Sequence, residues 1–371
     1  MRFTFIMPTD DLSGGNRVVA IYAKQLRLRG HQVLVVNQAL QQPSLRERFR
    51  ASKRAWRARQ WSAMAKAWLH QKTLPGHVAQ SGVPQRVLAR SGPITATDLP
   101  DADWLIATWW ETALWMDAMP ASKGRKAHLI QDYEVWAGGS TPQSVHAALR
   151  LPNCKIVISN ELKRTLDHKV GDLGLVVVPN AVDLQQFNAP ARTRHAVPTV
   201  GFMYGHSPRK AADILTQACE LARQQLPALR VLAFGADQPI AELPLPSGTE
   251  FFHRPAQQQL ASLYSRCDAW LFGSRIDSFG LPILEAMACR TPVIGVPVGA
   301  APELLADGAG LLVAPESAQA MATAIVALCT LPADQWQSMS DRAYDRAHNY
   351  SWDDATALLL QALAGYQEST K

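Results

Sequence analysis

The sequence lacks any hydrophobic run long enough to cross a membrane, because no stretch of about 18 apolar residues is free of charge, proline and glycine. The apolar N-terminus MRFTFIMP is followed by Asp10 and Asp11 without a small-residue cleavage site, so it predicts a buried first strand rather than a signal peptide. Internal repeats and low-complexity segments are also absent. These absences favour a globular protein, which we expect in the cytoplasm.

Cysteine is scarce, and its pattern excludes two kinds of structure. The five cysteines are odd in number and have no C-x-x-C spacing, which argues against a disulfide framework or a zinc site. The turn after the first strand carries Gly14-Gly15 but no G-x-G-x-x-G, which argues against an NAD-dependent dehydrogenase. The net charge of +6 is modest for 371 residues, and we expect no nucleic-acid partner.

The length and the hydrophobic content predict two folded domains. Apolar stretches that read as strands alternate with helical stretches in each half of the chain, which indicates two doubly wound α/β domains facing an interdomain cleft. We predict an N-terminal domain at 1–187, a linker at 188–198, a C-terminal domain at 199–349 and a final helix at 350–371 that crosses back to the first domain.

The predicted strands are short buried runs. They are MRFTFIMP, QVLVVN, DWLIATW, AHLIQDY, CKIVISN and GLVVVPN in the first half, and PTVGFMY, RVLAFGA, EFFHR, AWLFGS and TPVIGVP in the second. Because ligands bind beyond the carboxyl ends of such strands, the loops that follow them are expected to carry the function.

A segment at about 44–73 departs from this pattern. Between Arg46 and Lys72 it holds nine basic residues against the single acid Glu47, and it contains three tryptophans, Trp56, Trp61 and Trp68. Such a composition suits an anionic surface, either lipid headgroups or an acidic acceptor. A solvated helix whose aromatic side chains pack on the domain is the alternative, and the sequence leaves both open.

The segment 277–303, DSFGLPILEAMACRTPVIGVPVGAAPE, carries the strongest chemical signal. Pro282 is expected to open a helix, and the amides and positive dipole end before it suit a diphosphate. Gly280 has no Cβ, so a ligand can approach the backbone closely. Asp277 before the helix and Glu285, expected in its first turn, are natural acceptors for sugar and ribose hydroxyls.

This segment resembles the E-x7-E signature of the large retaining glycosyltransferase family of the GT-B fold, the family 4-like enzymes. Other matches are GGNRVVAIYAKQLRLRGHQVLVV, IVISNELKRTL, VVPNAVDLQQF, and FGADQP followed by LASLYSRCDAWLFGS. The resemblance covers most of the chain except about 40–100. It implies a hexosyltransferase that uses a nucleotide-diphosphate sugar, with retention of anomeric configuration.

The resemblance also implies roles for individual residues. Glu285 would bind ribose, Asp277 would lie beside the donor sugar, and Lys210 with Arg209 would neutralise the diphosphate as the leaving group departs. Backbone amides of the loop and the glycine pair of the first domain would surround the phosphates; these residues are Phe279, Gly280, Leu281, Gly14 and Gly15.

Three departures from the family pattern affect these roles. Asp277 stands where the signature has Glu, and the earlier arginine of the basic pair is missing, so that His206 or Arg209 would replace it. Near the end of the predicted strand AHLIQDY, the family often has a histidine for the donor's C6 hydroxyl, and Gln131 is the nearest residue here. Together with ATWWETA, this stretch resembles a bacterial subgroup that transfers L-rhamnose, a 6-deoxy sugar, from a dTDP donor.

The acceptor side is less defined. Asp132 and Glu134 alternate on an apparent strand end and would position the acceptor hydroxyl or take its proton, or would only bond to neighbouring loops. Asp101-Ala-Asp103 imitates a metal motif of another glycosyltransferase fold but reads as a solvated loop, and we predict no metal and no cofactor.

The function predicted is transfer of a hexose or 6-deoxyhexose to a saccharide or lipid-linked acceptor in bacterial surface glycan synthesis, with peripheral membrane contact. Two alternatives remain: a nucleotide-sugar epimerase on the same fold, which needs no acceptor surface, and a non-catalytic nucleotide-sugar binder, suggested by Asp277 and Gln131. The sequence does not decide the acceptor, the donor base or the oligomeric state.

Overall fold

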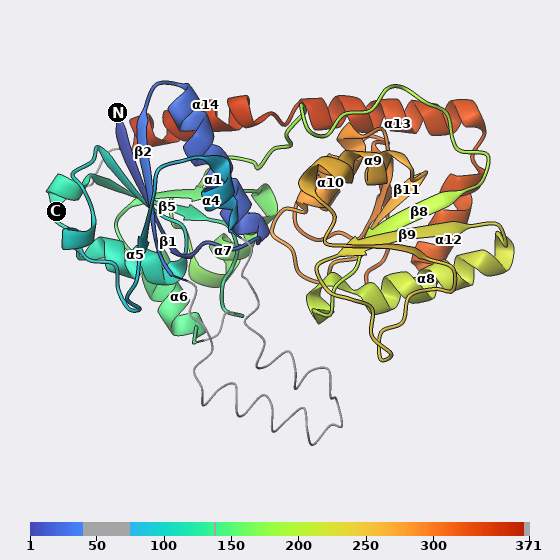
Figure 1. Cartoon of the computed structure of the whole chain (residues 1–371), viewed down its shortest axis with the longest axis horizontal. Helices are drawn as coiled ribbons and strands as arrows, with labels where there is room; N and C mark the ends of the chain where they lie inside the picture. Colours follow the sequence, from blue (N-terminus) through green and yellow to red (C-terminus); the bar gives the residue numbers. More distant parts are fainter. Residues whose placement is uncertain (40–74, 137–138, 367–371) are drawn as a thin grey trace, which may run out of the picture. The chain divides into compact units, whose positions relative to one another are not determined.

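The computed structural model of the protein describes residues 1–39, 75–136 and 139–366 (Figure 1). The basic segment predicted at 44–73 lies outside the described residues. The strands are β1 Arg2–Thr9, β2 Gln32–Gln38, β3 Gln85–Leu88, β4 Trp104–Ala107, β5 Arg125–Ile130, β6 Cys154–Val157, β7 Val176–Val177, β8 Thr199–Met203, β9 Arg230–Gly235, β10 Glu250–His253, β11 Ala269–Phe272, β12 Val293–Gly295 and β13 Gly310–Leu312.

Helices connect these strands. The α-helices are α1 Gly14–Leu28, α4 His77–Ser81, α5 Trp110–Asp117, α6 Pro142–Leu149, α7 Asn160–Val170, α8 Ala212–Gln225, α9 Leu260–Ser265, α10 Leu281–Ala288, α11 Ala301–Leu304, α12 Ala318–Thr330, α13 Ala333–His348 and α14 Trp352–Gly365. Short 3-10 turns are η1 Ala96–Asp98, η2 Ala121–Lys123, η3 Pro208–Lys210 and η4 Gln257–Gln259.

The chain divides into two compact units. The first unit comprises Met1–His128 and Ala147–Asn153, and the second comprises Leu129–His146 and Cys154–Lys371. Residues 188–198, predicted as a linker, contain no helix or strand. The final helix α14, with Ser351 as its N-cap, lies within the range 350–371 predicted for it, and its crossing back to the first domain stays a prediction.

Two parallel sheets confirm the predicted α/β fold class. One sheet has the order β3-β2-β1-β4-β5-β6-β7, and the other, in the second unit, has the order β10-β9-β8-β11-β12-β13. In each order the direction of winding reverses between two neighbouring strands, β1 and β4 in one sheet and β8 and β11 in the other. The doubly wound arrangement creates a ligand-binding position at each of these reversals.

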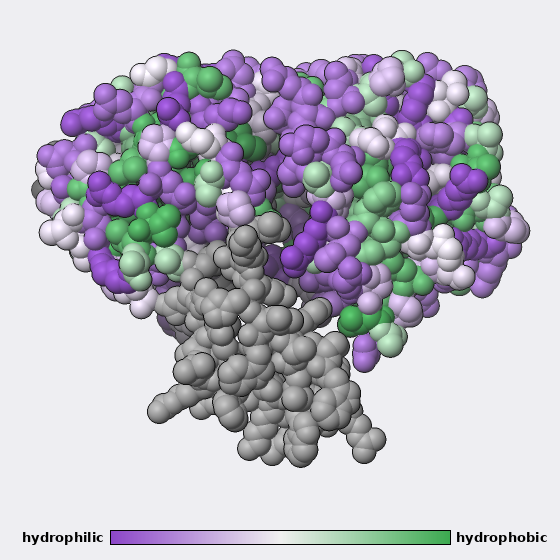
Figure 2. Space-filling model, in the orientation of Figure 1, coloured by the Kyte–Doolittle hydropathy of each residue, from purple (hydrophilic) through white to green (hydrophobic). Residues whose placement is uncertain are grey.

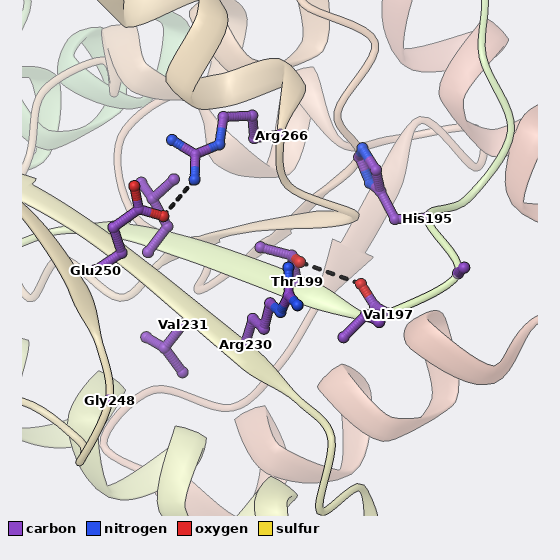
Figure 3. Close-up of a pocket in the computed structure, with 10 residues that line it drawn as sticks. His195, Val197, Thr199, Arg230, Val231, Gly248, Glu250 and Arg266 are labelled. Atoms are coloured by element: carbon purple, nitrogen blue, oxygen red, sulfur yellow. Dashed lines mark hydrogen bonds and ion pairs between the residues drawn. The ribbon is translucent and has the colours of Figure 1, made fainter.

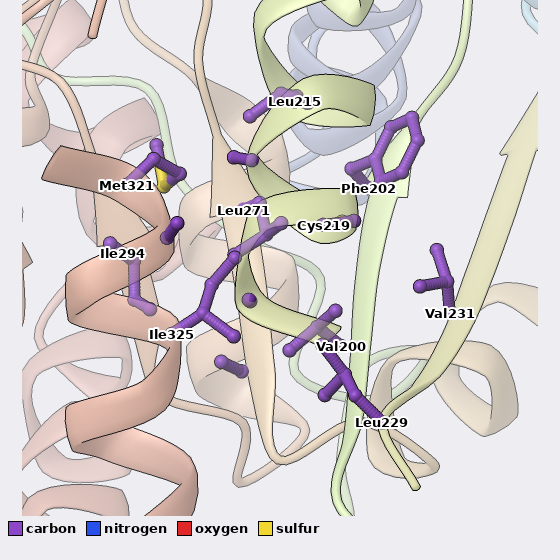
Figure 4. Packing of buried hydrophobic residues seen from close by; sticks show 14 of the residues in the cluster. Val200, Phe202, Leu215, Cys219, Leu229, Val231, Leu271, Ile294, Met321 and Ile325 are labelled. Carbon is purple, nitrogen blue, oxygen red and sulfur yellow. The ribbon is translucent and has the colours of Figure 1, made fainter. Parts of the chain in front are cut away.

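The core of the second unit explains why its strands read as apolar runs. Helices α8 and α12 cover the sheet, so side chains of the strands are buried between layers (Figure 4). Members of this core are Val200, Phe202, Leu215, Cys219, Leu271, Ile294, Met321 and Ile325. Burying each large aliphatic side chain contributes about 1.5–3 kcal/mol, which fixes the strands and therefore the loops at their ends.

Several local predictions need correction. The glycine pair is not a loop, because Gly14 and Gly15 are the first two residues of α1, whose N-cap Ser13 accepts a hydrogen bond from Asn16. Strand β5 ends at Ile130, so Asp132 and Glu134 lie in the following loop and not on a strand. Strands β3 and β13 were not predicted from the sequence, because they are short and only partly buried.

Most of the face seen in Figure 2 is hydrophilic, with hydrophobic residues in scattered groups. Of the helices in the described residues, none has the length and apolar character needed to cross a membrane.

Candidate functional site

The candidate site lies beyond the carboxyl ends of β8 and β11, the two strands at which the second sheet reverses its winding. The chain after β8 leads into η3, and the chain after β11 leads to α10. A backbone hydrogen bond connects these two loops directly: Arg275 N donates to Arg209 O at 2.8 Å. Segments more than sixty residues apart in sequence are thereby brought to one edge of the sheet.

Lys210 and Asp277 form an ion pair at this edge. Lys210 is the last residue of η3, and its Nζ lies 2.9 Å from Oδ2 of Asp277. About a third of the Lys210 side chain, 32%, is exposed, so the ammonium group remains accessible to a ligand. A positive charge held in place in this way is suited to an anionic group such as a diphosphate.

The second carboxylate oxygen of Asp277 organises the loop before α10. Asp277 Oδ1 accepts hydrogen bonds from the amides of Phe279 at 3.2 Å and Gly280 at 2.8 Å. Both amides were expected to hold a diphosphate, and here they bind Asp277. The third amide of that prediction belongs to Leu281, the first residue of α10, where an N–H group has no carbonyl partner within the helix.

Gly280 allows this loop to turn into the helix. It is the N-cap of α10 and has a φ of 88°, in the left-handed region that L side chains rarely adopt. A Cβ at this position would lie 2.9 Å from Ile283 Cδ1 and 3.0 Å from Phe272 Cζ. The backbone conformation and the crowding both require glycine here.

Glu285 lies deeper than the sequence predicted. Pro282 is the second residue of α10, so Glu285 is the fifth and falls in the second turn rather than the first. Its side chain is buried, and Oε2 accepts a hydrogen bond of 2.7 Å from the hydroxyl of Tyr264. Tyr264 therefore fixes the orientation of the carboxylate. A carboxylate oriented in this way is preorganised to accept hydrogen bonds from a diol such as ribose.

Asp132, also in the second unit, accepts four hydrogen bonds from residues that the structure describes. Its Oδ1 accepts from Ser278 Oγ at 2.6 Å and from Tyr133 N at 2.8 Å. Its Oδ2 accepts from Trp136 Nε1 at 2.8 Å and from Arg209 Nη2 at 3.1 Å. A carboxylate has about four acceptor sites, so this arrangement favours a positioning role over proton abstraction. Base catalysis by Asp132 stays a prediction.

Arg209 is held beside Lys210 but faces a different group. Its guanidinium carbon lies 4.1 Å from the ring centroid of Trp136, while Nη2 bonds to Asp132. This cation–π contact and the ion pair together fix the guanidinium. Of the two basic residues predicted for the diphosphate, only Lys210 contacts Asp277.

His206, Gln131, Glu134 and the glycine pair complete the set of predicted residues. His206 donates its backbone N–H to Asp237 Oδ2, and its ring Nε2 lies 2.7 Å from Gln238 O. Glu134 is buried and Gln131 half-buried in the loop after β5. The glycine pair belongs to the first unit.

Sequence reasoning missed three supporting side chains. Tyr264 orients Glu285, Ser278 bonds to Asp132, and Trp136 packs against Arg209. Ser159, the N-cap of α7, adds a further link, because its hydroxyl donates to Ser278 O at 2.8 Å. Ser278 lies in the segment DSFGLPILE and Ser159 in IVISNELKRTL, but a single sequence does not show that these two residues are in contact.

The described ranges contain no group of three or more His, Cys, Asp and Glu side chains that could hold a metal ion. Asp101 and Asp103, which imitate a metal motif, instead form exposed ion pairs with Lys123 and Arg2.

Comparison with known proteins points to one family. Residues 194–330 match the family model described as "Glycosyl transferases group 1". A D-inositol 3-phosphate glycosyltransferase of Saccharomonospora viridis is 30% identical over 303 residues, which are 71% of this chain and 68% of the relative. Another, of Mycobacterium avium, is 30% identical over 214 residues, which are 52% of this chain and 50% of the relative.

The chain thus spans about half the length of several of the curated relatives it matches. Among solved structures, the Anabaena protein HepE in complex with UDP superimposes with a TM-score of 0.74 at 17% identity, over 99% of this chain and 100% of that chain. This likeness shows the fold. The relatives named here are not rhamnosyltransferases, so the rhamnose-transferring subgroup stays a prediction.

Proposed function

This chain belongs to the glycosyl transferases group 1 family, and from this premise we propose that it transfers a hexose from a nucleotide-diphosphate donor to a hydroxyl acceptor. One observation carries the proposal. Asp277 pairs with Lys210 and also bonds to the amide of Gly280, the N-cap of α10, where the second sheet reverses its winding. A cation, a helix N-terminus and the buried carboxylate of Glu285 match a diphosphate and a ribose diol.

UDP is the donor nucleotide we test first, because the similar Anabaena protein was solved with UDP and with UDP-glucose. The alternative donor is a 6-deoxyhexose such as L-rhamnose on dTDP, supported by Gln131 where the family often has a histidine. A thermal-shift panel of UDP, dTDP, GDP, UDP-glucose and dTDP-rhamnose separates these. A ligand at a hundred times its dissociation constant stabilises the folded state by about 2.7 kcal/mol.

The expected result is stabilisation by one diphosphate and its sugar, reduced in Lys210→Ala and retained in the surface variant Arg164→Gln. Stabilisation by no nucleoside diphosphate would overturn the proposal. A second assay measures release of the nucleotide from its sugar in the presence of an acceptor. We expect this release from a transferase, but not from a non-catalytic binder or an epimerase.

We further propose that the acceptor is a phosphorylated polyol, a saccharide or a lipid-linked sugar. The first class is supported by the relatives, whose name specifies D-inositol 3-phosphate. The lipid-linked class is supported by the basic segment at 44–73, which suits peripheral attachment to an anionic membrane. Assays with one acceptor of each class, with radiolabelled donor, decide among them.

We also propose that transfer retains the anomeric configuration. We further propose that it needs no metal or other cofactor, since Lys210 supplies positive charge for the departing diphosphate. Proton NMR of the first product gives its configuration. Full activity in the presence of EDTA is the expected result for the second part, and loss of activity that added Mg²⁺ restores would contradict it.

A further inference from the structure

A cavity of about 520 Å³ opens in the second unit, away from the candidate site (Figure 3). Its volume falls within the range of about 300–1,000 Å³ typical of small-molecule sites. Its lining includes His195, Val197, Thr199, Arg230, Glu250 and Arg266.

The cavity lies at the amino-terminal edge of the sheet. Thr199, Arg230 and Glu250 are the first residues of β8, β9 and β10, which run parallel. Lys210 and Asp277 follow the carboxyl ends of strands in the same sheet. Since β8 has five residues at about 3.3 Å each, the two edges are about 16 Å apart. A small molecule in the cavity therefore cannot reach the atoms at the candidate site.

The lining carries an excess of positive charge. Arg230 and Arg266 face one acid, Glu250, which is already paired with Arg266. The Arg230 side chain, by contrast, has neither an ion pair nor a hydrogen bond within the part of the chain that the structure describes. In Figure 3 Arg266 points to Glu250, and Arg230 lies beside Thr199 in the lower part of the view. This arrangement leaves guanidinium donors available to an anion.

The wall formed by residues 195–199 is fixed in place. The backbone N and the ring Nδ1 of His195 each lie 2.8 Å from Asp268 Oδ1, and Thr199 N donates to Asp268 Oδ2 at 2.9 Å. Asp268 is fully buried, so these bonds are shielded from water. A wall held in this way needs little ordering when a ligand binds, which favours affinity.

We propose that this cavity binds a small organic anion, a phosphate or carboxylate on a partly apolar body, at a site separate from the nucleotide-sugar site. Guanidinium groups recognise such anions through paired N–H donors, and Arg230 and Arg266 would supply them. The aliphatic side chain of Val197 would contact the apolar body. Because the ligand would lie about a strand's length from the candidate donor site, it would not compete with the donor for space.

The test measures thermal unfolding with inorganic phosphate and with phenyl phosphate, at constant ionic strength set with NaCl. Saturating UDP is included so that phosphate cannot act through the candidate donor site. The expected result is a saturable rise in Tm, with phenyl phosphate binding more tightly than phosphate. Arg230→Gln should weaken binding about tenfold by loss of a charge-assisted hydrogen bond. Arg164→Gln, an exposed arginine of α7, should leave it unchanged.

The proposed site would be overturned if Tm showed no saturable rise, or if Tm rose equally in Arg230→Gln and in the wild type. Equal affinity for the two phosphates would overturn the apolar part of the proposal. The affinity of Arg230→Gln for UDP should match that of the wild type. If UDP fails to bind while the Arg230-dependent shift is present, only the proposed transferase function fails.

Discussion

Glu285 and Lys210 show how the local surroundings of a charged residue set what it can do. Glu285 is buried and held by the hydroxyl of Tyr264, whereas Lys210 is part-exposed and paired with Asp277. The first arrangement suits a rigid acceptor of hydrogen bonds, and the second suits a cation that a charged ligand can reach. Each arrangement leads to a separate prediction.

Glu285→Gln should weaken binding of the nucleotide itself. The amide still offers one oxygen to Tyr264, but its NH₂ group cannot accept a ribose hydroxyl. Loss of a charge-assisted hydrogen bond costs about 1.5–3 kcal/mol, roughly a tenfold or larger loss of affinity. Calorimetric titration with UDP and dTDP measures it, and an affinity equal to that of the wild type would contradict the ribose assignment.

Tyr264→Phe is the matched control for this change. It removes the donor to Glu285 and leaves the carboxylate in place. We expect a smaller loss of nucleotide affinity than in Glu285→Gln, accompanied by a loss of stability, because the buried carboxylate loses the hydrogen bond from this hydroxyl.

Lys210→Ala should lower kcat more than it raises the donor KM. Negative charge grows on the diphosphate as the glycosidic bond breaks, so a cation there contributes more to the transition state than to the ground state. Lys210→Arg keeps the charge and should retain part of the activity. Steady-state kinetics with the donor found in the panel give both parameters. A change in KM alone would show that Lys210 binds donor and transition state equally.

At the scale of the element, α10 combines an N-terminus directed to the site with a loop that only one residue type permits. Asp277 fastens the loop through the Phe279 and Gly280 amides, and Gly280 makes the turn. The helix thus presents its first turn at the carboxyl edge of the sheet. Its stability depends on the geometry of the loop as much as on helix propensity.

Gly280→Ala should therefore destabilise the protein more than Gly82→Ala. Both glycines lie in the left-handed region, with φ of 88° and 71°, but a Cβ at Gly82 meets nothing within 4 Å. The shared backbone penalty is about 1–2 kcal/mol, and crowding at Gly280 adds about 1–3 kcal/mol. Urea unfolding measures the difference. Equal losses of unfolding free energy would show that the neighbours Phe272 and Ile283 relax without cost.

At the scale of the whole molecule, two parallel sheets supply the frame and the loops supply the chemistry. The reversal of winding between β8 and β11 places two distant loops together, and the same topology leaves the opposite edge of the sheet for a separate cavity. Loops at opposite edges of one sheet can bind different ligands without competing for space.

The whole chain should bind anionic vesicles and ignore neutral ones. Each basic residue near anionic lipid contributes about 1 kcal/mol, and the segment at 44–73 carries nine against one acid. Binding should be lost near roughly 0.5 M salt, where the Debye length is only a few Å. Vesicle co-sedimentation at low and high salt measures it.

The variant with Arg50, Arg54 and Arg57 all replaced by Gln should bind these vesicles weakly. Its affinity for the donor nucleotide should not change, because Lys210, Asp277 and Glu285 belong to the second unit. If the wild-type protein ignores anionic vesicles at low salt, the membrane role fails and a soluble acceptor is favoured.

The sequence by itself determined the fold class, because buried parallel strands must read as continuous apolar runs, and it located Lys210, Asp277 and Glu285 through motifs that follow those strands. Only the tertiary structure decided which side chains meet. The pairing of Lys210 with Asp277, the hydroxyl of Tyr264 on Glu285, and the bonds of Ser278 and Arg209 to Asp132 join segments distant along the chain. Sheet order and packing set such distances, and no local pattern in the sequence records them.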